Sequence, residues 1–172
     1  MLLKTRRLHL RPIAASDAPA LFLARGDPTV MKFWDWPEQR SIGDVEEIIA
    51  AHAPEIESGR VMWWAVSSSR DGPAIGECDL SEIDIGHRRA EVGFLFARAH
   101  WGQGYAHEAV QAVLDHAFGA MDLERLSARC HEGNHASVRL LERLGFSFEG
   151  RLRSHIVRDG ARRDCLLYGR LR

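Results

Sequence analysis

The sequence contains only three cysteines, Cys78, Cys130 and Cys165, and none of them forms a CxxC pair. An odd number of widely spaced thiols is not a disulfide framework, and the nine histidines complete no metal-ligand spacing with them. We therefore expect neither disulfides nor a metal site. A buried structural thiol is the simplest role for each cysteine.

Long apolar runs and an excess of one charge are also missing. No segment reaches the length of a membrane span or has the form of a signal sequence, which predicts a cytoplasmic protein without a membrane partner. The formal net charge of −1 gives no general attraction to nucleic acid, and an RNA contact would need a local arginine patch. A length of 172 residues predicts one domain, residues 1–172. A monomer and a homodimer are both open.

The most informative stretch of the sequence lies between residues 90 and 121 and consists of a strand, a turn and a long helix. Residues 92–97 are apolar on both faces of an extended chain, as in a strand that is covered on both sides. From Ala106 to Phe118, apolar side chains recur at helical spacing, which predicts an amphipathic helix packed on that strand. The strand is therefore expected to be central.

The turn between these two elements reads Trp101-Gly102-Gln103-Gly104-Tyr105-Ala106. Its small residues expose the first N–H groups of the helix, and such a helix start favours an anion. Two nucleotide-binding motifs are excluded, because a P-loop needs a Gly-Lys pair and a dinucleotide fingerprint needs a small residue where this chain has His107. Glycines that serve only to turn the chain are the alternative interpretation.

The turn resembles the acyl-coenzyme A binding signature of the GNAT superfamily of N-acetyltransferases, [QR]-x-x-G-x-[GA], with Gly104 and Ala106 in the two small positions. Trp101 stands where the signature has Gln or Arg, but the form WGxGYAxEA resembles the ribosomal-protein alanine N-acetyltransferases, the RimJ/RimL-like branch. A second block, from Asn134 to Phe146, resembles the N-x-A-S, helix and LGF block of the same branch.

This resemblance covers the chain from about Leu8 to Tyr168 and implies a single-domain α/β fold. The expected sheet is mixed, has six or seven strands and carries helices on both faces. The resemblance also implies that the central strand and the next one splay apart, with the pantetheine arm of acetyl-coenzyme A (acetyl-CoA) in the gap. The residues that it implies for binding acetyl-CoA are Leu95, Phe96, Trp101, Gly102, Gln103, Gly104, Tyr105, Ala106, Asn134 and Ser137.

Acetylation of an amine requires a base, because an ammonium has no lone pair and must lose a proton before it attacks a thioester. Glu91, at the start of the central strand, is the first candidate. Glu77 and Asp79 follow, because they share one face of the preceding strand. Solvated carboxylates on a sheet would explain all three equally well. No side chain need act as a covalent nucleophile, so direct transfer is expected.

The remaining catalytic roles come from the resemblance. It implies an oxyanion donor in the backbone near Leu95 or Phe96. Ser137 resembles the residue that assists the leaving thiolate, with Tyr105 as the reserve candidate, although a first-turn hydroxyl bonded to the backbone is the alternative for Ser137. Asn134 would bind the pantetheine amides, and capping of the following helix would explain the same residue.

The resemblance thus implies an enzyme that transfers the acetyl group of acetyl-CoA to a primary amine. A protein N-terminus, such as that of a ribosomal protein, is the first choice of acceptor, and a small amine (a polyamine, an antibiotic or an amino acid) is the second. A non-catalytic acyl-CoA binding protein is the third possibility. The aromatic loop from Phe33 to Pro37 is either a wall of the acceptor pocket or a lid that buries its own side chains.

Overall fold

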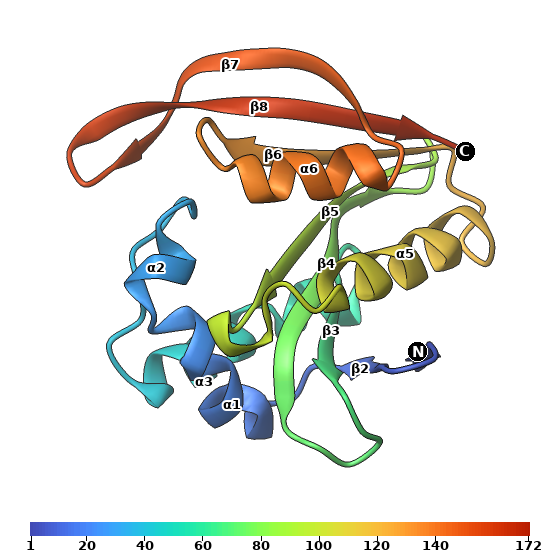
Figure 1. Ribbon diagram of the computed structural model, residues 1–172. Coiled ribbons are helices and arrows are strands. Elements are labelled where there is room, and N and C mark those ends of the chain that lie inside the picture. The colour runs from blue at the N-terminus through green and yellow to red at the C-terminus, as the bar shows by residue number, and fades with distance from the viewer.

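One open sheet of eight strands organises the structure, a computed structural model that describes residues 1–172 (Figure 1). Its strand order is β1-β2-β3-β4-β5-β6-β8-β7, so β5 lies near the middle. Only β5 and β6 pair in parallel, and the sheet is mixed as expected. The strands are β1 (Leu3–Lys4), β2 (His9–Pro12), β3 (Met62–Ser67), β4 (Ala74–Asp84), β5 (Arg89–Phe96), β6 (Arg125–His131), β7 (Ser147–Arg158) and β8 (Ala161–Leu171).

The expected count of six or seven strands is wrong by the short strand β1. Its two residues pair with His9 and Leu10 of β2, and two residues are too few to show any alternation of apolar and polar side chains. The strand expected over residues 92–97 is observed as β5.

Helices cover both faces of this sheet. They are α1 (Ala18–Arg25), α2 (Pro28–Met31), α3 (Ile42–Ala51), α4 (Ala53–Glu57), α5 (Tyr105–Phe118) and α6 (His135–Arg143). Trp63 and Ala65 of β3 belong to an apolar cluster with α1 and α3, whereas Trp64 and Val66 belong to the main core with α5. Successive residues of one strand therefore face two different helical layers. None of the helices is long and apolar enough to cross a membrane.

Helix α5 packs against β4 and β5 at the centre of the sheet (Figure 1). Val110, Val113 and Leu114 are completely buried, and burial of such side chains contributes roughly 1.5–3 kcal/mol each. The predicted apolar stripe of this helix is confirmed. This packing fixes the position at which α5 starts, immediately after the glycine turn that follows β5.

The pairing between β5 and β6 ends early. The two strands are in register only from Arg89 and Arg125 to Glu91 and Ser127, although β5 continues to Phe96 and β6 to His131. Figure 1 shows the strands diverging beyond this point. The splay implied by the resemblance is therefore present, and it leaves one edge of β5 without a neighbouring strand.

Candidate active site

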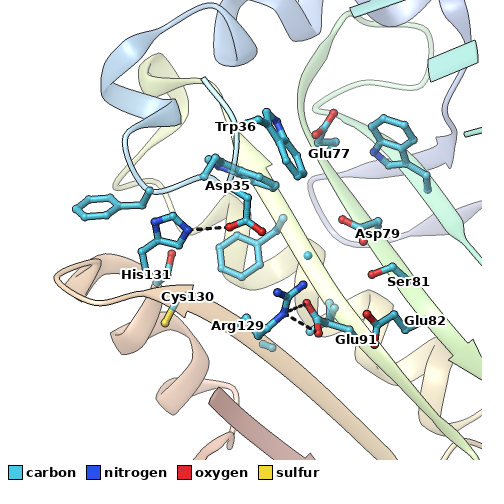
Figure 2. Close-up of a pocket in the computed structure, with 18 of the residues that line it drawn as sticks. Asp35, Trp36, Glu77, Asp79, Ser81, Glu82, Glu91, Arg129, Cys130 and His131 are labelled. Atoms are coloured by element: carbon cyan, nitrogen blue, oxygen red, sulfur yellow. Dashed lines mark hydrogen bonds and ion pairs between the residues drawn. The ribbon is translucent and has the colours of Figure 1, made fainter. Parts of the chain in front are cut away.

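A cavity of about 360 Å³ lies where β5 and β6 separate. Figure 2 shows side chains from β4, β5 and β6 and from the aromatic loop directed toward it. The start of α6 completes the lining. The polar residues discussed below are Arg25, Asp35, Glu77, Asp79, Glu91, Arg129, His131, Asn134 and Ser137, all of which line this cavity.

Glu77 of β4 is part of a buried ion pair. It is 2% exposed, and its Oε1 accepts a hydrogen bond from Arg25 Nη2 at 2.5 Å, while Arg25 Nε lies 3.3 Å from Oε2. Burial raises the pKa of Glu77, and the positive charge of Arg25 opposes that rise. The interpretation of Glu77 as a solvated carboxylate is wrong. Arg25, the last residue of α1, was not identified from the sequence.

Asp79 lies two residues further along the same face of β4, without an arginine partner. Burial, and then the negative charge of Glu77, raise its pKa to about 7, against a hydrogen bond with Ser81. Across the ladder stands Gly93, where an added Cβ would overlap the Asp79 carboxylate. The glycine therefore leaves room for this acid, which is half ionised near neutral pH.

Glu91 of β5 is also bound by an arginine. Its two carboxylate oxygens lie 2.9 and 3.1 Å from Arg129 Nε of β6. Burial raises the pKa of Glu91, whereas the charge and hydrogen bond of Arg129 oppose the rise. The carboxylate that is the first candidate for the base is therefore engaged in an ion pair with Arg129.

The aromatic loop forms a wall of the cavity, through Phe33, Trp34 and Trp36. It is attached to the other side of the cavity by Asp35, whose Oδ1 lies 2.8 Å from Nε2 of His131 on β6. The hydrogen bond with His131 lowers the pKa of Asp35, so the carboxylate accepts and the imidazole Nε2–H donates. The side chain of His131 is 4% exposed. The loop therefore lines a cavity and does more than bury its own side chains.

The unpaired edge of β5 presents main-chain N–H groups to the gap. Ala97 N donates to Ile75 O at 3.0 Å, so Ala97 points its N–H toward β4. Main-chain N–H groups alternate in direction along an antiparallel ladder. The N–H of Leu95 therefore also points toward β4, and the N–H of Phe96 points toward the gap. Of the two predicted donors, only the N–H of Phe96 is thus available.

The glycine turn has the backbone conformation that requires glycine. Gly102 and Gly104 have φ values of +73° and +77°, and Gly104 is the residue before α5. Trp101 Nε1 donates to Phe96 O at 2.8 Å, and the Gln103 side chain donates to Ala99 O at 3.0 Å. Both side chains therefore brace the turn, and the main chain at the start of α5 remains exposed.

Tyr105 and Ala106 begin α5 outside the cavity. Neither residue lines it, and both pack at the margin of the main core. The guanidinium carbon of Arg7 lies 4.7 Å from the centre of the Tyr105 ring. Tyr105 is therefore held next to the turn, apart from the carboxylates of β4 and β5.

Asn134 and Ser137 meet at the start of α6. Asn134 Oδ1 accepts a hydrogen bond from Ser137 N at 3.2 Å, which confirms the predicted cap and leaves the Asn134 amide donor unused. The Ser137 hydroxyl makes no hydrogen bond within the chain, so the backbone-bonded alternative is not observed. Cys130 also lines the cavity, but burial raises its pKa to about 11, which keeps the thiol protonated.

Residues 7–147 match the family described as acetyltransferase (GNAT) domain. The uncharacterized N-acetyltransferase YoaA of Bacillus subtilis is 31% identical over 167 residues, which are 97% of this chain and 94% of that protein. Among solved structures, RimL, a ribosomal L7/L12 alpha-N-protein acetyltransferase in complex with coenzyme A, has a TM-score of 0.89 at 21% identity and covers 99% of this chain and 98% of its own. The spermidine N-acetyltransferase of Vibrio cholerae, in complex with CoA and spermine, has a TM-score of 0.84 at 24% identity and covers 97% and 96%.

Proposed function

The chain belongs to the GNAT family of acetyltransferases, and we propose that its acceptor is a small primary amine that carries more than one positive charge. The enzyme is an acetyl-CoA-dependent N-acetyltransferase. Proteins of similar fold include one named for ribosomal-protein acetylation and one named for spermidine acetylation. Their sequence identities to this chain, 21% and 24%, support the shared fold only, so the acceptor is inferred from the cavity.

The observation that carries this proposal is the charge of the cavity. Six carboxylates line it, against two arginines. Arg25 and Arg129 each bind one of them, and His131 binds a third. Three carboxylates without a cationic partner remain at the wall and mouth, namely Glu55, Asp79 and Glu82.

An acceptor with two or more ammonium groups would match these carboxylates, and its alkyl segments would lie against the aromatic loop. Tryptophan faces attract cations as well as alkyl groups, which suits Trp34, Trp36 and Trp63 around the same cavity. A protein N-terminus presents only one ammonium of its own, so it would leave most of these carboxylates unmatched. The cavity therefore favours the small cationic amine over the N-terminus that the resemblance puts first.

The residues around the gap fit the donor, which supplies the acetyl group as a thioester. N–H groups without partners lie along the free edge of β5, in the main chain of the glycine turn and on the side-chain amide of Asn134. The turn would bind the diphosphate of acetyl-CoA, because its glycines admit close approach at the positive end of α5. Asn134 would bind the amides of the pantetheine arm.

We assign the base to Asp79, because a carboxyl with a pKa of about 7 is matched to proton transfer near neutral pH and Glu91 is engaged by Arg129. Asp79 would take one proton from the acceptor ammonium and release it to water. The N–H of Phe96 would stabilise the thioester oxygen as negative charge develops on it. Ser137 would donate its hydroxyl proton to the departing sulfur. It would regain a proton from the nitrogen, which loses its second proton as the amide forms. The transfer is direct.

The acceptor is tested by measuring thiol release from acetyl-CoA with spermidine, putrescine, a monoamine of equal length and N-terminal peptides. We expect kcat/KM for spermidine to exceed that of the monoamine by about tenfold or more, equivalent to one additional charge contact of about 1.4 kcal/mol. Glu82→Gln should reduce this preference, whereas Glu46→Gln on the exposed face of α3 should not. A peptide with a higher kcat/KM than every polyamine would overturn the proposal.

A further inference from the structure

The segment before β2 is bound tightly to the start of α5. Glu108, in the first turn of α5, accepts hydrogen bonds from Thr5 Oγ1 at 2.5 Å and from Arg7 N at 2.9 Å through Oε1. Its Oε2 accepts from Arg7 Nε at 2.6 Å. These contacts join residues about one hundred positions apart, and they use both oxygens of one carboxylate.

The same arginine contacts the glycine turn itself. Arg7 Nη1 donates to the main-chain oxygen of Gln103 at 3.0 Å, and the guanidinium lies over the ring of Tyr105. The plane of the guanidinium is therefore set by three neighbours, namely Glu108, Gln103 and Tyr105. A rigid guanidinium loses less conformational entropy when it binds an anion than a mobile one does.

One edge of this guanidinium is unused. Arg7 Nη2 makes no hydrogen bond within the chain, and it lies 3.4 Å from the point that a Cβ on Gly104 would occupy. The side chain of Arg7 is 36% exposed, so this edge reaches solvent next to the exposed main chain of the turn. Two N–H donors with a positive charge thus stand at the start of α5, where the helix itself favours an anion.

We propose that Arg7 binds the diphosphate group of acetyl-CoA together with the main chain of the glycine turn, and that Glu108 is the positioning residue that holds Arg7 there. Guanidinium groups suit phosphate oxygens, because their N–H donors form paired, charge-assisted hydrogen bonds. The inference rests on acetyl-CoA as the donor and is independent of which amine is acetylated. It extends the binding site to a part of the chain that lies outside both sequence motifs.

A simpler role for Arg7 would be to fasten the N-terminal segment to α5 without contact with the donor. The two roles differ in salt dependence and in the stability of the free protein. Loss of a diphosphate contact weakens binding of coenzyme A, most at low salt, and leaves pantetheine, which lacks the diphosphate, unchanged. Loss of a fastening contact lowers the melting temperature of the free protein, and the weaker binding of coenzyme A to a loosened turn would not depend on salt in this way.

The experiment measures the Kd of coenzyme A and of pantetheine by calorimetry for the wild type and for Arg7→Gln. We expect the Kd of coenzyme A to rise about tenfold, the effect of one charge-assisted hydrogen-bond pair, and the Kd of pantetheine to stay within twofold. Higher salt should narrow the difference between wild type and variant, because the contact is between exposed charges. Arg7→Lys keeps the charge without the paired donors and should give an intermediate rise.

Two neighbouring residues provide matched controls. Arg6→Gln removes the same charge from an exposed side chain that has no partner, and it should leave the Kd of coenzyme A unchanged. Thr5→Val removes one contact to Glu108 and the acceptor of the Arg7 and Leu8 main-chain N–H groups, but it leaves the Arg7 guanidinium with its own partners, and it should lower the melting temperature more than the affinity. The proposal is overturned if Arg7→Gln and Arg7→Lys leave the Kd of coenzyme A unchanged, or if they weaken pantetheine binding to the same extent.

Discussion

Asp79 and Gly93 lie directly opposite each other on β4 and β5, and the carboxylate of Asp79 occupies the space that a side chain at position 93 would fill. The absence of a side chain on one strand therefore sets the position of an acid on the next. Since Asp79 is also the cavity carboxyl whose pKa is close to 7, this cross-strand relationship links the sheet register to the proposed chemistry.

Gly93→Ala should displace the Asp79 carboxylate and so impair catalysis without changing the donor site. General bases contribute about a hundredfold or more to rate, so partial displacement is expected to lower kcat by about tenfold. The measurement is kcat with one amine and the Kd of coenzyme A. Gly150→Ala in β7 is the matched control, because a Cβ there meets no atom within 4 Å. Wild-type kcat in a folded Gly93→Ala variant would contradict the assignment.

The pH dependence of kcat/KM should identify the base. Asp79 must be ionised to accept a proton, so the rate should rise with pH through about 7 and level off above it. Glu77 raises the pKa of Asp79 through its negative charge, and Glu77→Gln should therefore shift this limb to lower pH.

Two substitutions separate the candidate bases in the same pH profiles. Asp79→Asn should abolish the limb and lower the neutral rate by about a hundredfold or more. Glu91→Gln should cost only a few-fold and keep the limb, because its carboxylate is paired with Arg129. The opposite pattern would return the base to Glu91, the residue that the sequence ranks first.

The parts of the fold that were predicted from the sequence have a local physical cause. The stripe from Ala106 to Phe118 predicts α5 because helical period is visible within one segment. Asn134 caps α6 through a contact only three residues away. The glycine of the LGF block has a local cause too, because Gly145, with a φ of +80°, follows the end of that helix.

The contacts that shape the site have no such local cause. Arg25 and Glu77 are 52 residues apart, and Asp35 and His131 are 96 residues apart. No periodicity connects such partners, so the sequence identified carboxylates on one face of β4 but could not show which of them are neutralised. That distinction, which favours Asp79 over Glu91, depends on how the strands and the helices pack in three dimensions.

The contact between Asp35 and His131 should control how the acceptor binds. It holds the aromatic loop against β6, and Arg163 on β8 supports it by donating to Lys32 O at 3.0 Å. Asp35→Ala removes this contact, so the tryptophans of the loop would lose their fixed position over the cavity. We expect KM for the amine to rise about fivefold to tenfold, the cost of one hydrogen bond to a charged group, with kcat changed less.

The direction of the pKa shift adds a pH test to this prediction. Since the hydrogen bond with His131 lowers the pKa of Asp35, the carboxylate is ionised and the contact is complete at neutral pH. The contact weakens only in acid, when the pH falls below the usual Asp pKa of about 3.9 and the carboxylate is protonated. The effect of Asp35→Ala on KM should therefore be present at neutral pH and should shrink in acid, where the wild-type carboxylate is protonated. Asp35→Asn retains an acceptor for the imidazole N–H and should fall between the wild type and the alanine variant. Asp71→Ala, in the turn between β3 and β4, is the control and should leave KM unchanged. An Asp35→Ala enzyme with wild-type KM for every amine tested would show that the loop keeps its place without His131.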